Sequence, residues 1–319
     1  MTLFLLVGGF LLLTIGASIL VDGAASVAKR YGISNLVIGL TVVAFGTSSP
    51  EMVVNVVSAL RGTTDIAIGN VLGSNIFNIL AILGLSALIR RLPVQESTIR
   101  GEIPLSLVAA LLLFPLGAPY LSLPLDGSDP SALGRIDGII LLLFFAYFLR
   151  YTFKNARTGT ESDGSVKLFS LPVSVAMIVA GFAMLVFGGK FLVDGAVIVA
   201  RHFGIAERVI GLTIVAAGTS LPELATSMVA AYKKNADIAV GNIVGSNIFN
   251  IFLILGISAV IRPLPFSTGT TVDLSVTALC SMLLFVLVYR RTDRRLGRRD
   301  GALLVAFYVA YVSYLTVGT

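Results

Sequence analysis

GLTVVAFGTSSPE, from Gly39 to Glu51, recurs in this chain as GLTIVAAGTSLPE, from Gly211 to Glu223. Each copy places one glutamate and one proline inside an apolar stretch that otherwise resembles a membrane span. A carboxylate is costly inside a bilayer, so an ionisable residue within a span indicates a functional site. Two related copies predict a paired cation site.

The composition is typical of a membrane protein. Of the 319 residues, 56% are hydrophobic and 13% charged, and the mean hydropathy is +0.95. A soluble domain cannot hide so much apolar surface. The net charge of +6 does not indicate a nucleic-acid partner, because the basic residues lie in short loops between apolar runs. One cysteine and one histidine exclude thiolate and histidine metal clusters, and we expect no cofactor.

Ten apolar segments are candidate spans, which need about 20 mostly apolar residues. They are Leu3–Val21, Leu36–Leu60, Ile66–Ile89, Ile103–Leu116 and Ile136–Phe148 in the first half, and Leu171–Val199, Val209–Tyr232, Ile238–Ile261, Val272–Val288 and Ala302–Val317 in the second. A polar stretch divides the halves. We therefore expect an all-α integral membrane protein with a first repeat at 1–152, a linker at 153–170 and a second repeat at 171–319.

The basic residues predict the orientation of these spans. Of the 23 lysines and arginines, one set of loops holds only Arg61, Arg135, Arg201, Arg208 and Arg262. All the others except Lys190, which lies within a span, fall in the opposite set of loops. Cytoplasmic loops are enriched in Lys and Arg. We therefore expect a multi-pass protein of the cell inner (plasma) membrane, with the linker in the cytoplasm and both termini outside.

The repeat extends well beyond the opening motif. Residues 22–90 align with residues 194–262 without a gap, and more than half of the pairs are identical. Each half contains five predicted spans, an odd number, so the second half should enter the membrane upside down. Inverted repeats are common in secondary transporters, whose sites lie near the midplane between the repeats. A scaffold duplicated for packing alone would not require repeated Glu, Thr, Ser and Asn residues at membrane depth.

The prolines of the motif predict broken helices. Pro50 and Pro222 each lack a backbone donor and obstruct the preceding helical turn, so the second and seventh spans should break or kink there. Carbonyls freed by the break become candidate oxygen ligands around Ala44, Thr47, Ala216 and Thr219. Hydroxyls three or four residues before each glutamate share its helical face, namely those of Thr47, Ser48, Thr219 and Ser220. Bonding to the preceding turn is the alternative role for these hydroxyls, but it fits the paired arrangement poorly.

A second motif, GNxxGSNIFN, occupies residues 69–78 and 241–250. Ser74 and Asn78 are four residues apart and share a face, as do Ser246 and Asn250. The glycines of the motif allow close helix approach, so these oxygens could reach the carboxylates. Four further asparagines could either coordinate an ion or form interhelical hydrogen bonds, and both roles stay open for Asn70, Asn75, Asn242 and Asn247.

The oxygen ligands suit a hard cation. Calcium takes six to eight oxygens at about 2.3–2.6 Å, whereas magnesium dehydrates reluctantly and usually retains waters. Two carboxylates at one site repel each other when the site is empty. One divalent ion, several monovalent ions or protons would each relieve that repulsion. Competition between them is a physical basis for exchange.

These paired motifs resemble the calcium/cation antiporter superfamily, specifically its prokaryotic sodium/calcium exchanger branch. The resemblance covers both repeats and, in topology, nearly the whole chain. It implies ten transmembrane helices in two inverted-topology five-helix repeats, with helices 2 and 7 broken. It also implies antiport by alternating access, in which Na⁺ enters as Ca²⁺ leaves, and no enzymatic activity.

The same resemblance implies roles for individual residues. The calcium site would be formed by Glu51, Glu223, Thr47 and Thr219. Flanking sodium sites would also use Ala44, Ser48, Ser74, Ala216, Ser220 and Ser246. Asn78 and Asn250 would face each other at the centre. Some archaeal relatives carry aspartate at the position of Asn250, so this centre has one potential charge fewer and the ion stoichiometry stays open.

Other functions remain as alternatives to sodium/calcium exchange. A proton/calcium or potassium-dependent exchanger fits because glutamates can carry protons, although glycines replace the glutamate of the GNxxE pattern of proton-coupled relatives. A cation channel fits the symmetry but not two occluding half-sites. An intramembrane enzyme is least supported, because no histidine or cysteine accompanies the acids. The expected partners are Ca²⁺, Na⁺ and the lipid bilayer, with the protein monomeric.

Overall fold

The computed structural model describes residues 2–117, 132–154, 167–203, 216–266 and 268–317, which are almost entirely helical. The first half contains α1 (Thr2–Tyr31), α2 (Asn35–Ile38), α3 (Ala44–Thr47), α4 (Ser49–Arg61), α5 (Thr64–Phe77), α6 (Gly84–Ile89), α7 (Glu96–Arg100), α8 (Glu102–Gly117) and α9 (Arg135–Lys154). The second contains α10 (Leu171–His202), α12 (Ala216–Gly218), α13 (Leu221–Tyr232), α14 (Ala236–Ile248), α15 (Gly256–Ile261), α16 (Thr268–Tyr289) and α17 (Arg298–Val317). Short π-helical segments at Gly39–Val43, Asn78–Leu83 and Phe249–Leu255 connect neighbouring helices.

Several helices can cross a membrane. Seven within the described residues have the length and hydropathy of a span: Thr2–Tyr31, Thr64–Ile89, Glu96–Gly117, Arg135–Lys154, Leu171–Val199, Ala236–Ile261 and Gly269–Tyr289. The bent pair Asn35–Thr47 and Ser49–Arg61 is an eighth candidate. The predicted seventh span begins outside the described residues, and the predicted tenth corresponds to helix α17. The prediction of an all-α membrane protein is confirmed.

The second span is broken where its proline predicts. Its two parts meet at 48°, and Ser48 between them has φ −81° and ψ 7°. Pro50 then lies in the first turn of α4, where its missing N–H leaves no helical bond unmade. Ser220 precedes α13 with nearly the same backbone, φ −90° and ψ 9°, and Pro222 lies in the first turn of that helix. Both copies of the motif therefore start a new helix just before their glutamate.

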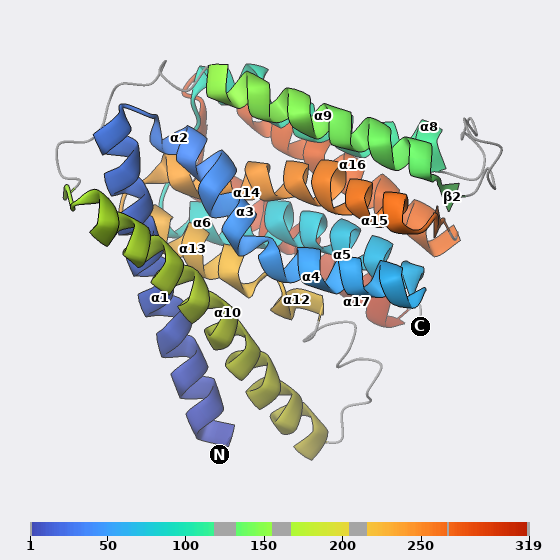
Figure 1. Ribbon diagram of the computed structural model, residues 1–319, viewed down its shortest axis with the longest axis horizontal. Helices are drawn as coiled ribbons and strands as arrows, with labels where there is room; N and C mark the ends of the chain where they lie inside the picture. The colour runs from blue at the N-terminus through green and yellow to red at the C-terminus, as the bar shows by residue number, and fades with distance from the viewer. Residues whose placement is uncertain (1, 118–131, 155–166, 204–215, 267, 318–319) are drawn as a thin grey trace.

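Helices α1 and α10 lie side by side and extend obliquely from the other helices (Figure 1). Glycines spaced seven residues apart line their contact. A Cβ added at any of them would lie 2.7–2.9 Å from an atom of the opposite helix, at Gly9, Gly16 and Gly23 of α1 and at Gly181, Gly188 and Gly195 of α10. Only a hydrogen at these positions allows the two backbones to approach so closely.

The two halves interlock at their ends. Strand β1 (Leu92–Pro93) pairs with β4 (Arg295–Leu296), and β2 (Ala132–Leu133) pairs with β3 (Leu264–Pro265). After these pairs, α9 packs against α15 of the other half, and α17 packs against α6. A Cβ at Gly138 would lie 2.7 Å from the Gly256 carbonyl, and one at Gly301 would lie 2.6 Å from the Gly84 carbonyl. Each half thus uses its last helix to cover the other half, in a two-fold arrangement.

Candidate cation site

The two glutamates of the repeated motif are both buried, and each contacts the opposite half of the chain. Glu51 lies in the first turn of α4 and Glu223 in the first turn of α13, and each is only 1% exposed. The Ser220 hydroxyl donates to Glu51 Oε1 at 2.8 Å, and the Ser48 hydroxyl donates to Glu223 Oε1 at 2.9 Å. Each carboxylate is therefore held by a serine from the other half of the chain.

The threonines make a second reciprocal pair of contacts. Thr47 donates to Asn242 Oδ1 at 3.0 Å, and Thr219 donates to Asn70 Oδ1 at 3.3 Å. The Ser220 hydroxyl also lies 3.1 Å from Ser74 Oγ. These contacts connect the broken helices of one half to α5 or α14 of the other. The residues predicted from both motifs thus converge on one place.

Four asparagines connect α5 and α14 and the π-helical segments that follow them. Asn78 donates to Asn247 Oδ1, and Asn250 donates to Asn75 Oδ1, each at 2.9 Å. Asn75 and Asn247 also donate to each other's backbone carbonyl, at 3.3 and 3.4 Å. Asn75 and Asn247 therefore form interhelical hydrogen bonds, one of the two roles that the sequence left open. Their amide oxygens hold the amide nitrogens of Asn78 and Asn250.

The contacts leave a group of buried oxygens without donors. Within the described residues, no hydrogen bond reaches Glu51 Oε2, Glu223 Oε2, Asn78 Oδ1, Asn250 Oδ1 or Ser246 Oγ. Buried polar groups normally find partners, and each unpaired one costs free energy. All five belong to the predicted site residues. A cation coordinated by these oxygens would remove that cost.

The sequence predicted that the helix break would free backbone carbonyls, and the structure differs at Ala44. The Ala44 carbonyl accepts a hydrogen bond from Ser48 N at 3.0 Å, because the helical turn continues up to the break. The Thr47 hydroxyl lies 3.3 Å from the same carbonyl. Ala216 is the first residue of α12, one turn before Ser220. In this conformation side-chain oxygens, rather than the Ala44 carbonyl, are the unpaired ligands.

Two π-helical segments lie at the centre of the site, and the sequence interpretation did not include them. Asn78 begins the segment Asn78–Leu83, and Asn250 is the second residue of Phe249–Leu255. A π-helical turn changes the direction of the following side chains, and such turns are frequent at functional sites. They occur at the same place in both halves. No residue pattern distinguishes them from the α-helix that was expected.

Among the described residues, two carboxylates supply the charge of the site. Among the residues that the structure describes, no group of three or more His, Cys, Asp or Glu side chains could hold a metal ion. The remaining ligands are hydroxyl and amide oxygens, which suit hard cations. The number of charged ligands sets the affinity of such sites. The arrangement is therefore suited to binding a hard cation reversibly.

The sequence matches the family described as Sodium/calcium exchanger protein over residues 1–154 and 173–317. The chain belongs to the sodium/calcium exchanger family. The predicted superfamily and its prokaryotic branch are thereby confirmed. As a member of this family, the chain is a membrane antiporter for cations, including Ca²⁺, and not an enzyme.

Relatives of this exchanger extend over its whole length. Inner membrane protein YrbG of Escherichia coli (strain K12) is 39% identical, with 98% of this chain and 95% of the relative covered. Sodium/calcium exchanger MaX1 of Methanosarcina acetivorans is 30% identical, with 96% of each chain covered. A solved structure of the sodium-calcium exchanger NCX_Mj, soaked with Na⁺ and Sr²⁺, is similar with a TM-score of 0.84 at 31% identity. That comparison covers 98% of this chain and 97% of the other.

Proposed function

We propose that this exchanger moves Ca²⁺ against Na⁺ across the cell inner membrane by alternating access to the site between its halves. The observation that carries the proposal is the set of buried oxygens without donors, which both halves contribute around Glu51 and Glu223. The names of the relatives MaX1 and NCX_Mj, both sodium/calcium exchangers, support Na⁺ as the coupling ion.

Within this proposal, Ca²⁺ binds at the centre and Na⁺ binds on both sides of it. The calcium ligands are Glu51, Glu223, Thr47 and Thr219. The sodium sites add Ala44, Ser48 and Ser74 on one side, and Ala216, Ser220 and Ser246 on the other. Asn78 and Asn250 orient their unpaired amide oxygens toward the central ion. Because both glutamates serve the calcium and sodium sites, the two ions compete for the same carboxylates.

We infer an inverted-repeat topology with ten spans. Reciprocal contacts support it. The Ser48–Glu223 hydrogen bond recurs with the halves exchanged as Ser220–Glu51, and the Asn78–Asn247 bond recurs as Asn250–Asn75. Residues 1–152 and 171–319 form the two repeats, and residues 153–170 connect them on the cytoplasmic side. Both termini then lie outside. In this topology an opening toward one side of the membrane has a symmetry-related opening toward the other.

The test is ion flux in proteoliposomes that contain the purified full-length protein. An outward Na⁺ gradient should drive uptake of ⁴⁵Ca²⁺, because Na⁺ and Ca²⁺ compete for one pair of carboxylates. A proton gradient or a K⁺ gradient without Na⁺ should not drive it. Uptake that is indifferent to Na⁺ and follows protons or K⁺ would assign a different coupling ion. Uptake without any counter-gradient dependence, at channel-like rates, would contradict antiport itself.

A further inference from the structure

The pairing of β1 with β4 gathers basic residues from distant parts of the chain around a hollow at one end of the helices. Arg90 and Arg91 directly precede β1, and Arg298 begins α17 just after β4. The hollow has a volume of about 570 Å³. Five basic side chains line it, those of Arg90, Arg91, Lys234, Arg295 and Arg298, and none of the acidic residues that the structure describes does. A smaller hollow of about 400 Å³ shares Arg91, Arg295 and Arg298, and its lining also includes Asp293.

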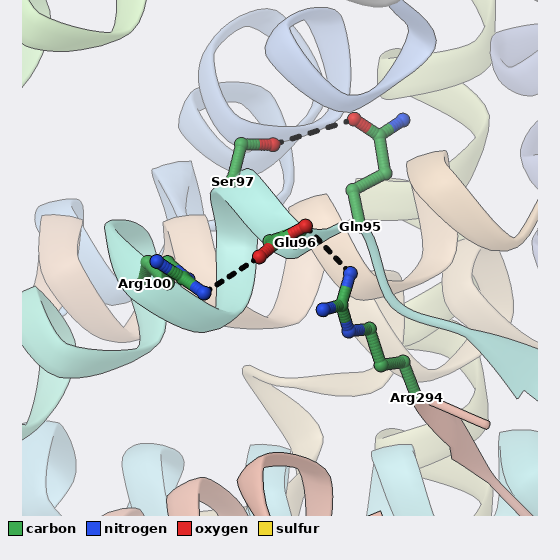
Figure 2. Close-up of polar contacts among 5 residues, drawn as sticks. All are labelled: Gln95, Glu96, Ser97, Arg100 and Arg294. Atoms are coloured by element: carbon green, nitrogen blue, oxygen red, sulfur yellow. Dashed lines mark hydrogen bonds and ion pairs between the residues drawn. The ribbon is translucent and has the colours of Figure 1, made fainter. Parts of the chain in front are cut away.

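Neighbouring arginines are already neutralised, but these five basic residues are not. Glu96 lies 2.8 Å from Arg100 and 2.6 Å from Arg294 (Figure 2). Arg291 pairs with Asp300 at 2.6 Å. Among the described residues, none of the five that line the larger hollow forms an ion pair. Several unpaired positive charges in a concave surface concentrate a positive potential, which attracts an anion.

Backbone dipoles add to this positive potential. Ala236 is the first residue of α14 and lines the hollow, as does Arg298, the first residue of α17. Helix N-termini carry partial positive charge and unpaired N–H groups, and both favour phosphate. Asp300 already accepts the Gly297 N–H at 2.7 Å, so the first turn of α17 is partly capped. The five side chains therefore remain the principal source of charge.

Lys234 occupies a backbone conformation that favours glycine. Its φ is +68°, and the residue at the same position of the first repeat is Gly62, with φ +82°. A side chain in this left-handed region costs conformational free energy, and glycine avoids that cost. Strained residues persist mainly where the surroundings or a function require them. In the second repeat the strained position carries a cation that faces the hollow.

The opposite end of the molecule provides an internal comparison. The ladder of β2 and β3 repeats the geometry of β1 and β4, with Leu133 and Leu264 paired as Leu296 and Leu92 are. Three basic residues of the hollow have uncharged counterparts there, because Pro263 replaces Arg91, Gly62 replaces Lys234 and Ala132 replaces Arg295. Only Arg262 and Arg135 keep the charge of their counterparts. The fold does not require this cluster, since its symmetry-related copy lacks most of it.

We propose that the hollow binds the phosphate of an anionic phospholipid headgroup. It lies at the ends of the apolar helices α6 and α17. Tyr232 and Tyr289, both exposed, end α13 and α16 close by in the sequence to the clustered basic residues. Tyrosines are enriched at the level of the headgroups, where basic residues attract anionic lipids. This binding is independent of which ion couples to Ca²⁺.

Lipid binding to the full-length protein tests the proposal. Native mass spectrometry in detergent would measure binding of dioctanoyl phosphatidylglycerol and dioctanoyl phosphatidylcholine. Each Lys or Arg near a membrane surface contributes about fivefold to anionic-lipid affinity. Arg91→Gln with Arg298→Gln should therefore weaken phosphatidylglycerol binding at least tenfold. The matched control, Arg135→Gln with Arg262→Gln, removes the same charge at the opposite end and should leave binding unchanged.

A third variant and a soluble competitor distinguish a lipid headgroup from a small phosphate ester. Lys234→Gly removes one charge while relieving its backbone, so it should weaken phosphatidylglycerol binding about fivefold without loss of folding. Equal losses of phosphatidylglycerol binding in both double variants would contradict the proposed site. Equal binding of the two lipids to the unchanged protein would also contradict it. Glycerol 3-phosphate should not compete at the concentration of the lipid. Competition at that concentration would assign the hollow to a soluble phosphate ester and contradict the proposal of a lipid headgroup.

Discussion

The two halves of the molecule carry the same residues at the site but hold them differently. Asn242 is fully buried, accepts from Thr47, and donates to Ser227 at 2.9 Å and to the Glu223 carbonyl at 3.4 Å. Its counterpart Asn70 is half-buried, and its amide nitrogen has no acceptor among the described residues. In the first half Asn55 stands where Ser227 does and itself donates to the Glu51 carbonyl at 2.8 Å, so a difference in sequence removes the acceptor that Asn70 would otherwise have.

The glycines beside these asparagines also differ in burial. Gly241 and Gly245 of α14 are buried against the segment around Leu36 and Leu40, whereas Gly69 of α5 is exposed. The α14 side of the site is therefore closely packed against the first half, while the residues at 208 and 212 that correspond to Leu36 and Leu40 lie outside the described ranges. The alternating access proposed above requires the two halves to exchange such packing during the cycle.

The largest expected effect concerns the two glutamates, which are equivalent in the two halves. Glu51→Gln and Glu223→Gln should each abolish ⁴⁵Ca²⁺ uptake, since each removes half of the negative charge at the site. Loss of one partner from a buried ion pair, here a carboxylate with Ca²⁺, costs about 3–5 kcal/mol, or about 10²–10⁴-fold in binding. The loss of transport is measured as ⁴⁵Ca²⁺ uptake in proteoliposomes, and size-exclusion elution verifies that each variant is folded.

Glu96→Gln is the matched control for those variants, because Glu96 is a half-exposed glutamate that pairs with Arg294 away from the site. It should leave uptake intact. Unequal losses in the two site variants would show that the halves do not share the ion equally. Uptake retained in either site variant would exclude that carboxylate from the site.

A smaller effect should reveal the difference in packing. A Cβ at Gly245 would lie 2.7 Å from the Leu40 carbonyl, whereas one at Gly73 would have no described atom within 4 Å. Gly245→Ala should therefore lower the free energy of unfolding by about 1–3 kcal/mol. Gly73→Ala should leave it unchanged or raise it by up to about 1 kcal/mol, because alanine favours the helix. Thermal unfolding in detergent compares the two.

Transport by the Gly73 variant sharpens this comparison. If the halves exchange environments during the cycle, Gly73 must at some stage pack as Gly245 does now. Gly73→Ala should then reduce the rate of Ca²⁺ uptake although the folded protein is no less stable. Full uptake in a stable Gly73→Ala variant would show that α5 never reaches the close packing of α14.

Much of the fold and of the site could be predicted because the chain contains its own comparison. Polar residues that recur at a fixed spacing inside apolar stretches indicate one buried site, and Pro50 indicates the break before Glu51. The convergence of Glu51, Glu223 and the serines beside them followed from that repetition. The two short strand pairs, β1 with β4 and β2 with β3, had a weaker signal in the sequence. LGRIDG at 133–138 recurs as LGRRDG at 296–301, but at a different spacing from the main repeat.

Other features could not be predicted from residue types. Asn75 and Asn78 belong to the same motif, but only the three-dimensional contacts show that Asn75 bonds across the helices while Asn78 keeps an unpaired oxygen. The different partners of Asn70 and Asn242 were likewise not predicted, although the two residues lie in nearly identical segments. Only the contacts show that Ser227, which lies outside both motifs, supplies an acceptor for Asn242.

The smallest expected effect concerns the two helix ends that precede α5 and α14. Gly62 and Lys234 both have positive φ, and only Lys234 has a side chain to accommodate. Lys234→Gly should raise the free energy of unfolding by about 0.5–1 kcal/mol by removing backbone strain, while Gly62→Ala should lower it by a similar amount. Thermal unfolding in detergent without added lipid measures both. Destabilisation by Lys234→Gly would mean that contacts of the lysine outweigh the strain, and the two helix ends would then differ by more than their charge.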